Sequence, residues 1–79
     1  MTRDSLQTYL EAKKIPSQWY NIGGMGLTDQ RTVLQEENGK WIVFYSERGI
    51  RFDLSSYDNE ADACKELLER IKELIKDYQ

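Results

Sequence analysis

The strongest pattern in the sequence is a stripe of hydrophobic residues near its C-terminal end. Apolar side chains recur there at steps of three residues and one, which is the spacing of one face of a helix of about five turns. The stripe consists of Ala61, Cys64, Leu67, Leu68, Ile71, Leu74, Ile75 and Tyr78. Asp58 or Asn59 is expected to cap the start of this helix, because short polar side chains accept from its free N–H groups. Cys64 lies within the stripe, so we expect its thiol to be buried and inert.

A second, shorter helix is predicted near the N-terminus. Leu6 and Leu10 lie one helical turn apart, and Asp4 or Ser5 is placed to cap the first turn. Pro16 is expected to end the helix, because proline disfavours helical geometry in the residue before it.

The next segment combines aromatic residues with glycines. Residues 18–22 have the composition of a short strand, and residues 23–26 include three glycines. We expect these glycines to begin a loop that reaches Asp29 and is held in place by its apolar residues, Met25 and Leu27.

The middle of the chain predicts two hairpins. Asn38-Gly39 stands between two β-rich runs, which is the strongest short hairpin signal. Arg48-Gly49 is a second candidate for a tight turn. If both turns have two central residues, the facing pairs include Glu37 with Lys40, Tyr45 with Phe52, and Val43 with Leu54.

The predicted register separates the side chains onto two faces, because neighbouring residues of a strand point in opposite directions. The face expected to form the core holds Leu34, Trp41, Val43, Tyr45, Phe52 and Leu54. The other face is mixed, with a small apolar centre of Val33, Ile42 and Phe44 among polar residues. Whether a helix covers this second face stays open at this point.

These elements predict one α+β domain over residues 1–79, in the order α-β-β-β-α. The sheet is expected to be a three-stranded antiparallel meander, or four-stranded if residues 18–22 contribute a short strand. Both helices are expected to pack on the core face of the sheet.

Composition and charge narrow the possible functions. The chain has 79 residues, no histidine and one cysteine, which excludes histidine-based catalysis, the usual zinc sites and an internal disulfide. With 14 acidic and 11 basic residues its net charge is −3, which argues against direct binding of nucleic acid or of anionic membranes. Its longest apolar run, residues 41–45, is far shorter than a membrane span or a signal-peptide core. We therefore expect a cytoplasmic protein without catalytic activity, cofactor or metal.

The acidic residues are concentrated in one stretch, residues 53–69, where Lys65 is the single basic residue. One interpretation is a solvated helix face with acidic residues at the positive end of the helix dipole. The other is a patch that meets a basic partner protein, since complementary charge speeds encounter. The candidate contacts are Asp53, Asp58, Glu60, Asp62, Glu66 and Glu69.

Aromatic residues and a hairpin tip are further candidates for partner binding. Phe44 and Tyr57 have no assigned place in the core, whereas Trp19 is expected to pack within it. Glu47 and Arg48 lie at the predicted hairpin tip, which can project into a partner's cleft.

The order of elements is similar to that of the double-stranded RNA-binding domain. That family carries a lysine cluster at the start of its second helix to grip phosphates. The matching stretch here, residues 58–65, is acidic, so RNA binding is not expected.

A second resemblance covers most of the chain. It resembles small bacterial immunity proteins of polymorphic-toxin and contact-dependent growth inhibition systems. The resemblance lies in IP at residues 15–16, WYNIGG at 19–24, WIVFYSERG at 41–49 and YDNEADAC at 57–64. It implies a cytoplasmic protein, a monomer or weak homodimer, that binds a cognate toxin domain, often a nuclease, and blocks its active site.

The leading hypothesis is therefore toxin neutralisation, with the acidic stretch opposite a basic nuclease cleft. One alternative is a small regulatory or phage-type adaptor that binds another protein through the mixed sheet face; a Phe44→Ser variant that folds but loses its partner would favour it. A second alternative is a homodimer in which a second copy covers Val33, Ile42 and Phe44.

Overall fold

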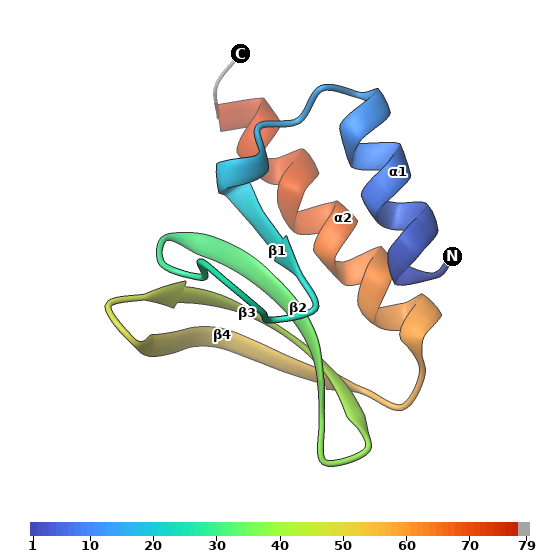
Figure 1. Cartoon of the computed structure of the whole chain (residues 1–79), viewed down its shortest axis with the longest axis vertical. Coiled ribbons are helices and arrows are strands. Elements are labelled where there is room, and N and C mark those ends of the chain that lie inside the picture. The colour runs from blue at the N-terminus through green and yellow to red at the C-terminus, as the bar shows by residue number, and fades with distance from the viewer. Residues whose placement is uncertain (78–79) are drawn as a thin grey trace.

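Two helices lie on the same side of a four-stranded sheet in the computed structural model, which describes residues 1–77 (Figure 1). The elements are α1 (Arg3–Ala12), the short 3-10 helix η1 (Ser17–Trp19), β1 (Tyr20–Ile22), β2 (Arg31–Glu37), β3 (Lys40–Glu47), β4 (Ile50–Tyr57) and α2 (Glu60–Asp77). The α+β class and the placement of a helix at each end of the chain are confirmed. Tyr78, the last residue of the predicted stripe, lies outside the described residues.

The sheet is mixed rather than antiparallel throughout, which corrects the predicted meander. Its strand order is β1-β2-β3-β4, and β1 runs parallel to β2 with Tyr20 beside Thr32. The other two pairings are antiparallel. Because β1 has only three residues, the glycine loop that follows it can return the chain to the same end of the sheet and start a parallel neighbour.

Both predicted hairpin turns are confirmed. The central residues of each turn, Asn38-Gly39 and Arg48-Gly49, all have positive φ angles, as a two-residue type I′ turn requires. The strand pairing places Glu37 beside Lys40 and Glu47 beside Ile50.

The register of β4 changes halfway along the strand. Tyr45 faces Phe52 as predicted, but Val43 faces Ser55 instead of Leu54. The extra residue is absorbed in a bulge at which Asp53 has a φ of 53°. Aspartate tolerates the left-handed region better than most residues, which permits the bulge here.

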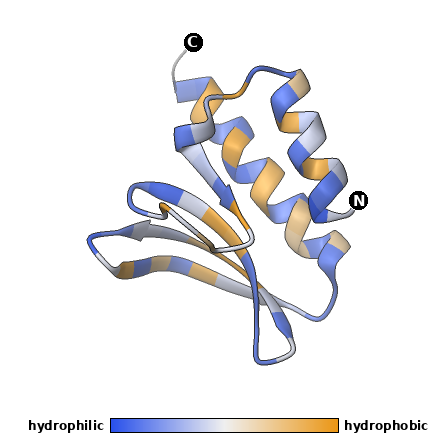
Figure 2. Ribbon diagram, viewed as in Figure 1, coloured by the Kyte–Doolittle hydropathy of each residue, from blue (hydrophilic) through white to orange (hydrophobic). Residues whose placement is uncertain are grey.

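The main core lies between the sheet and the helices. It consists of Leu6, Leu10, Tyr20, Leu34, Val43, Ala63, Cys64, Leu67 and Ile71. Figure 2 shows the hydrophobic positions of α2 as a stripe along the helix, and the two strands that α2 contacts most are β2 and β3. Trp19, Trp41 and Tyr57 pack at the margin of this core and are half-buried.

The second face of the sheet has its own small cluster, Val33, Ile42 and Phe44, which is the apolar centre that the sequence predicted. These side chains are at most 5% exposed in the single chain. Arg51 of β4 lies over the Phe44 ring at 4.6 Å and is paired with Glu37 of β2 at 2.8 Å. A second copy is therefore not needed to cover this cluster, and the observation that motivated a homodimer is lost.

The glycine loop is held by a polar side chain, which corrects the expectation that apolar residues hold it. Met25 is 88% exposed and Leu27 is 73% exposed. The amide nitrogen of Asn21, a residue only 9% exposed, donates to the carbonyl oxygens of both residues at 2.9 and 2.7 Å. Its amide oxygen accepts from the backbone N–H of Gly24 at 2.8 Å. Asn21 therefore holds the loop through its backbone, and the side chains of Met25 and Leu27 face the solvent.

The predicted N-terminal cap is confirmed for α2 but not for α1. Asn59 caps α2 as predicted, because its side-chain oxygen accepts from the backbone N–H of Asp62 at 2.8 Å. The N-terminal helix begins earlier than expected. Its cap is Thr2 rather than Asp4 or Ser5, with Thr2 and Ser5 bonded reciprocally in a capping box.

Cys64 is fully buried in the core, as expected, and this placement predicts a pH dependence of stability. Burial raises the pKa of the thiol above its ordinary value of 9.0, and the charge of Glu60 raises it further. The folded state then holds the proton more tightly than the unfolded state. The resulting stabilisation is complete below the unfolded pKa and is lost as pH rises through the folded pKa.

We therefore expect the Cys64→Ala variant to lose less stability than the parent chain between about pH 8 and pH 10, the range in which an unfolded thiol titrates. Urea unfolding midpoints across this range measure the difference. Tyr20, whose pKa burial also raises, contributes equally to both proteins. Parallel pH profiles would contradict the prediction.

Candidate functional site

The turn end of β4 carries hydrophobic side chains that no helix covers. Phe52 is 43% exposed and Leu54 48% exposed, so their predicted place in the core is wrong. Figure 1 shows that the β3–β4 turn projects away from both helices. Phe52 is paired with Tyr45 and therefore lies on the core face of the sheet, but beyond the reach of α2. We call Tyr45, Ile50 and Phe52 of this face, together with Leu54 on the opposite face beyond the bulge, the uncovered corner.

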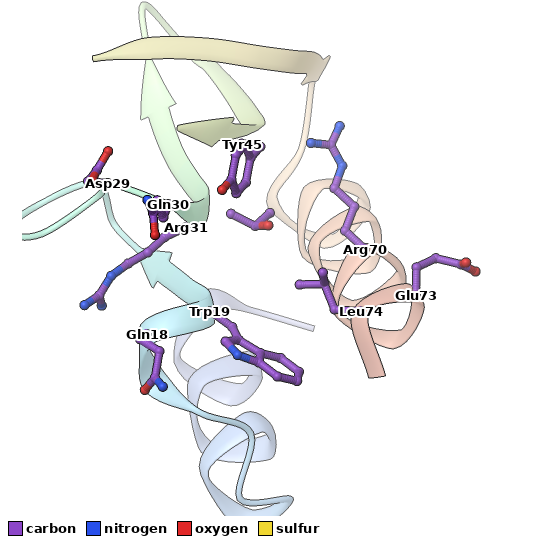
Figure 3. A pocket seen from close by; sticks show the side chains of 10 residues that line it. Gln18, Trp19, Asp29, Gln30, Arg31, Tyr45, Arg70, Glu73 and Leu74 are labelled. Atoms are coloured by element: carbon purple, nitrogen blue, oxygen red, sulfur yellow. The ribbon is translucent and has the colours of Figure 1, made fainter. Parts of the chain in front are cut away.

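A groove of about 570 Å³ opens beside this corner, between η1, the start of β2, β3 and the second half of α2. Thr32 and Tyr45 contribute from the sheet, Trp19 from η1 and Leu74 from α2. Figure 3 shows the rings of Tyr45 and Trp19 and the side chain of Leu74 around the same space.

The two arginines of the groove are held by other parts of the protein. Arg70 donates to Glu66 at 2.6 Å, to the backbone carbonyl of Asp53 at 2.6 Å and to the Ser55 hydroxyl at 3.1 Å. These bonds tie α2 to the bulge of β4 and satisfy the carbonyl group that the bulge removes from the strand ladder. In Figure 3 the guanidinium group of Arg70 points away from the groove.

Arg31 is likewise turned away, donating to the backbone carbonyl of Ser17 at 3.1 Å. Asp29 lies at the rim and accepts from the backbone N–H of Arg48 at 2.7 Å, which fastens the end of the glycine loop to the β3–β4 turn. The rim is therefore built from two loops that are joined by a hydrogen bond.

Tyr45 links the groove to the uncovered corner. It is half-buried, and its ring centroid lies 6.4 Å from that of Phe52. Burial raises the pKa of its hydroxyl, and the negative charges of Glu47 and Asp29 raise it further. The Tyr45 hydroxyl at the floor of the groove thus lies within reach of the charges of two carboxylates.

The acidic candidates from the sequence do not form one unpaired patch. Asp58 pairs with Lys40, which lowers the pKa of its carboxyl group, and Glu66 pairs with Arg70. Two others stabilise helix starts. Glu60 accepts from the backbone N–H of Arg3 at 2.8 Å, and Asp62 accepts from the Asn59 side chain at 3.0 Å. Asp53 and Glu69 are exposed.

The aromatic and turn candidates are divided between core and surface. Phe44 is only 3% exposed and presents no surface to a partner, while Tyr57 is half-buried against the main core. Glu47 is half-buried close to Tyr45, and Arg48 is exposed at the turn. The alternation that predicts Tyr45 and Phe52 in the core carries no signal for the path of α2, and it carries none for the bulge that moves Leu54 to the other face.

Comparison with protein-family models, with curated proteins and with solved structures finds no match to this chain. Within residues 1–77, no helix is both long and apolar enough to cross a membrane. The same residues contain no group of three or more acidic or cysteine side chains placed to hold a metal ion. The uncovered corner and its groove are thus the features of the described residues that suggest a function.

Proposed function

We propose that this protein is a non-catalytic binding module that inhibits a toxin domain by covering it, as an immunity protein does. The observation that carries the proposal is the uncovered corner, where Ile50 and Phe52 are exposed beside the half-buried Tyr45 on the core face of the sheet, and Leu54 is exposed on the opposite face beyond the bulge. Large hydrophobic and aromatic residues dominate the energetics of protein interfaces when a partner desolvates them. A domain of this size has little apolar surface to bury, and exposed hydrophobic side chains do not contribute to its stability.

Contact through side chains fits this surface better than the addition of a partner strand. β4 is an edge strand of eight residues, which is the usual template for strand addition. The bulge at Asp53 interrupts that edge, however, and the Asp53 carbonyl group already accepts from Arg70. Bulges of this kind protect edges against pairing with other chains.

The acidic residues of α2 support association with a basic partner. Replacing Asp62 and Glu69 together by lysine should slow association severalfold at low salt and reduce its salt dependence, because exposed charges steer diffusional encounter. Glu66 is left intact because it holds Arg70. Stopped-flow association at two ionic strengths measures the effect, with Glu36→Lys on the distant end of β2 as the control. An unchanged rate for the double variant would remove electrostatic steering from the proposal.

The proposed function is tested by purifying a tagged copy from the organism that carries the gene, with a salt series in the wash. We expect one basic toxin domain to be recovered, and expression of that domain alone to arrest growth unless this protein is present. Recovery of a non-toxic regulatory protein, held regardless of salt, would replace the immunity role by that of an adaptor.

A further inference from the structure

The two arginines that line the groove are both engaged by acceptors outside it. The Arg70 guanidinium is neutralised by Glu66 at 2.6 Å and fixed by two further acceptors. The Arg31 guanidinium is turned outward to the Ser17 carbonyl group. Both cations are therefore directed away from the space that Tyr45 and Trp19 line.

The anionic groups keep spare capacity. Asp29 uses one carboxylate oxygen for the Arg48 backbone N–H, which leaves its second oxygen to accept from another donor. Glu47 lies beside Tyr45, and its charge and that of Asp29 both act on the Tyr45 hydroxyl. On the opposite rim, Glu73 pairs with Lys76 at 3.5 Å and its carboxylate points away from the groove in Figure 3, so it takes no part in this site.

We propose that the groove binds the guanidinium group of an arginine side chain from the partner protein. An arginine can lay its planar group against the aromatic rings and donate to carboxylates at the rim with the same group. The volume of about 570 Å³ lies within the range of pockets that take a small ligand, roughly 300–1,000 Å³. That the arginine belongs to a protein partner rests on the proposed function.

Lysine would make poorer use of this site. Its ammonium group is compact and strongly hydrated, whereas the guanidinium group is planar and more weakly hydrated. The groove therefore favours a partner that presents an exposed arginine next to hydrophobic residues, which would lie on Ile50 and Phe52 at the uncovered corner.

The test uses the whole chain and three small probes, so that no partner is needed. ¹⁵N-labelled protein is titrated with N-acetyl-arginine amide, with the neutral analogue N-acetyl-citrulline amide and with N-acetyl-lysine amide. We expect saturable shifts at the Trp19 indole N–H and at the Tyr45 amide with the arginine probe. Its dissociation constant should be at least about fivefold lower than that of citrulline, the order expected for one cation–π contact, and also lower than that of lysine.

Charge variants that preserve the fold sharpen the test. Asp29→Asn retains the oxygen that accepts from Arg48, and Glu47→Gln retains the shape of its side chain. Together they should raise the dissociation constant of the arginine probe roughly two- to fivefold, the order of partly exposed ion pairs. Glu36→Gln removes an exposed carboxylate from the far end of β2 and should change nothing.

Each other outcome overturns the inference. Equal affinity for citrulline would show that charge is not recognised, and shifts elsewhere or no saturation would show that the groove is not the site. Shifts that grow with protein concentration alone would assign the groove to a second copy. If the chain captures a toxin domain but does not prefer arginine, the inference about the groove is wrong and the proposed function stands. If it prefers arginine but has no toxin partner, the groove inference stands and the proposed function is wrong.

Discussion

Leu34→Ala is expected to lower the free energy of unfolding by about 2–5 kcal/mol, the range measured for emptying a buried leucine site. Leu34 lies at the centre of β2, has no exposed surface and belongs to the core beneath α2. A domain of 79 residues has a total stability on the order of 4–12 kcal/mol at the usual stability per residue. The variant should therefore lose a large fraction of the total stability and unfold at a clearly lower urea concentration.

Leu54→Ala is the matched control, since it makes the same chemical change on another strand of the same sheet. Leu54 is 48% exposed, so its truncation should cost less than about 1 kcal/mol. Urea unfolding followed by the fluorescence of Trp19 and Trp41 measures both variants. Equal losses would mean that β4 is covered in solution and would contradict the description of the uncovered corner.

Phe52→Ala is expected to weaken partner binding about tenfold or more while leaving the fold almost unchanged. Truncation of a central aromatic contact at an interface costs more than about 1–2 kcal/mol, which corresponds to that factor. The ring is 43% exposed in the free protein and has Tyr45 as its ring neighbour, so the loss of packing within the chain is small. Calorimetric titration with the partner recovered by the tagged protein measures the change.

Phe44→Ser, in contrast, should act on stability. Its ring is buried with Val33 and Ile42 and covered by Arg51, so its removal should cost roughly 3–5 kcal/mol. Loss of binding by the Phe44→Ser variant could therefore result from unfolding. A variant of an exposed phenylalanine does not have this ambiguity. Full binding by a folded Phe52→Ala protein would move the docking surface away from the uncovered corner.

Local patterns specify most of the elements of this fold. The stripe from Ala61 to Ile75 predicts α2 because a long run of helical spacing has few competing interpretations. The two turns are equally well specified, since Asn38-Gly39 and Arg48-Gly49 suit the positive φ angles of a type I′ turn. From these turns the register of β2, β3 and the first part of β4 follows, and so does the small cluster around Phe44.

The candidate site was the part that local patterns could not supply. Tyr45 and Phe52 alternate with polar neighbours as core residues do, and the sequence alone gives no reason to exclude them from the core. Phe52 is uncovered because α2 packs mainly on β2 and β3, and Tyr45, on β3, is left half-buried beside the groove. The acidic candidates show both cases. Asp58 pairs with Lys40, 18 residues away, whereas the pair of Glu66 with Arg70 follows from the i,i+4 spacing of the helix.

The sequence by itself determined the helices, the turns and the alternation of the strands, because each depends on contacts between residues close along the chain. Tertiary structure decided the parallel pairing of β1, the bulge at Asp53 that Arg70 holds, and which part of the sheet α2 leaves uncovered. These features depend on how elements distant in sequence fit against one another in space. Their energies are set by packing and by hydrogen bonds that form only when the fold is complete.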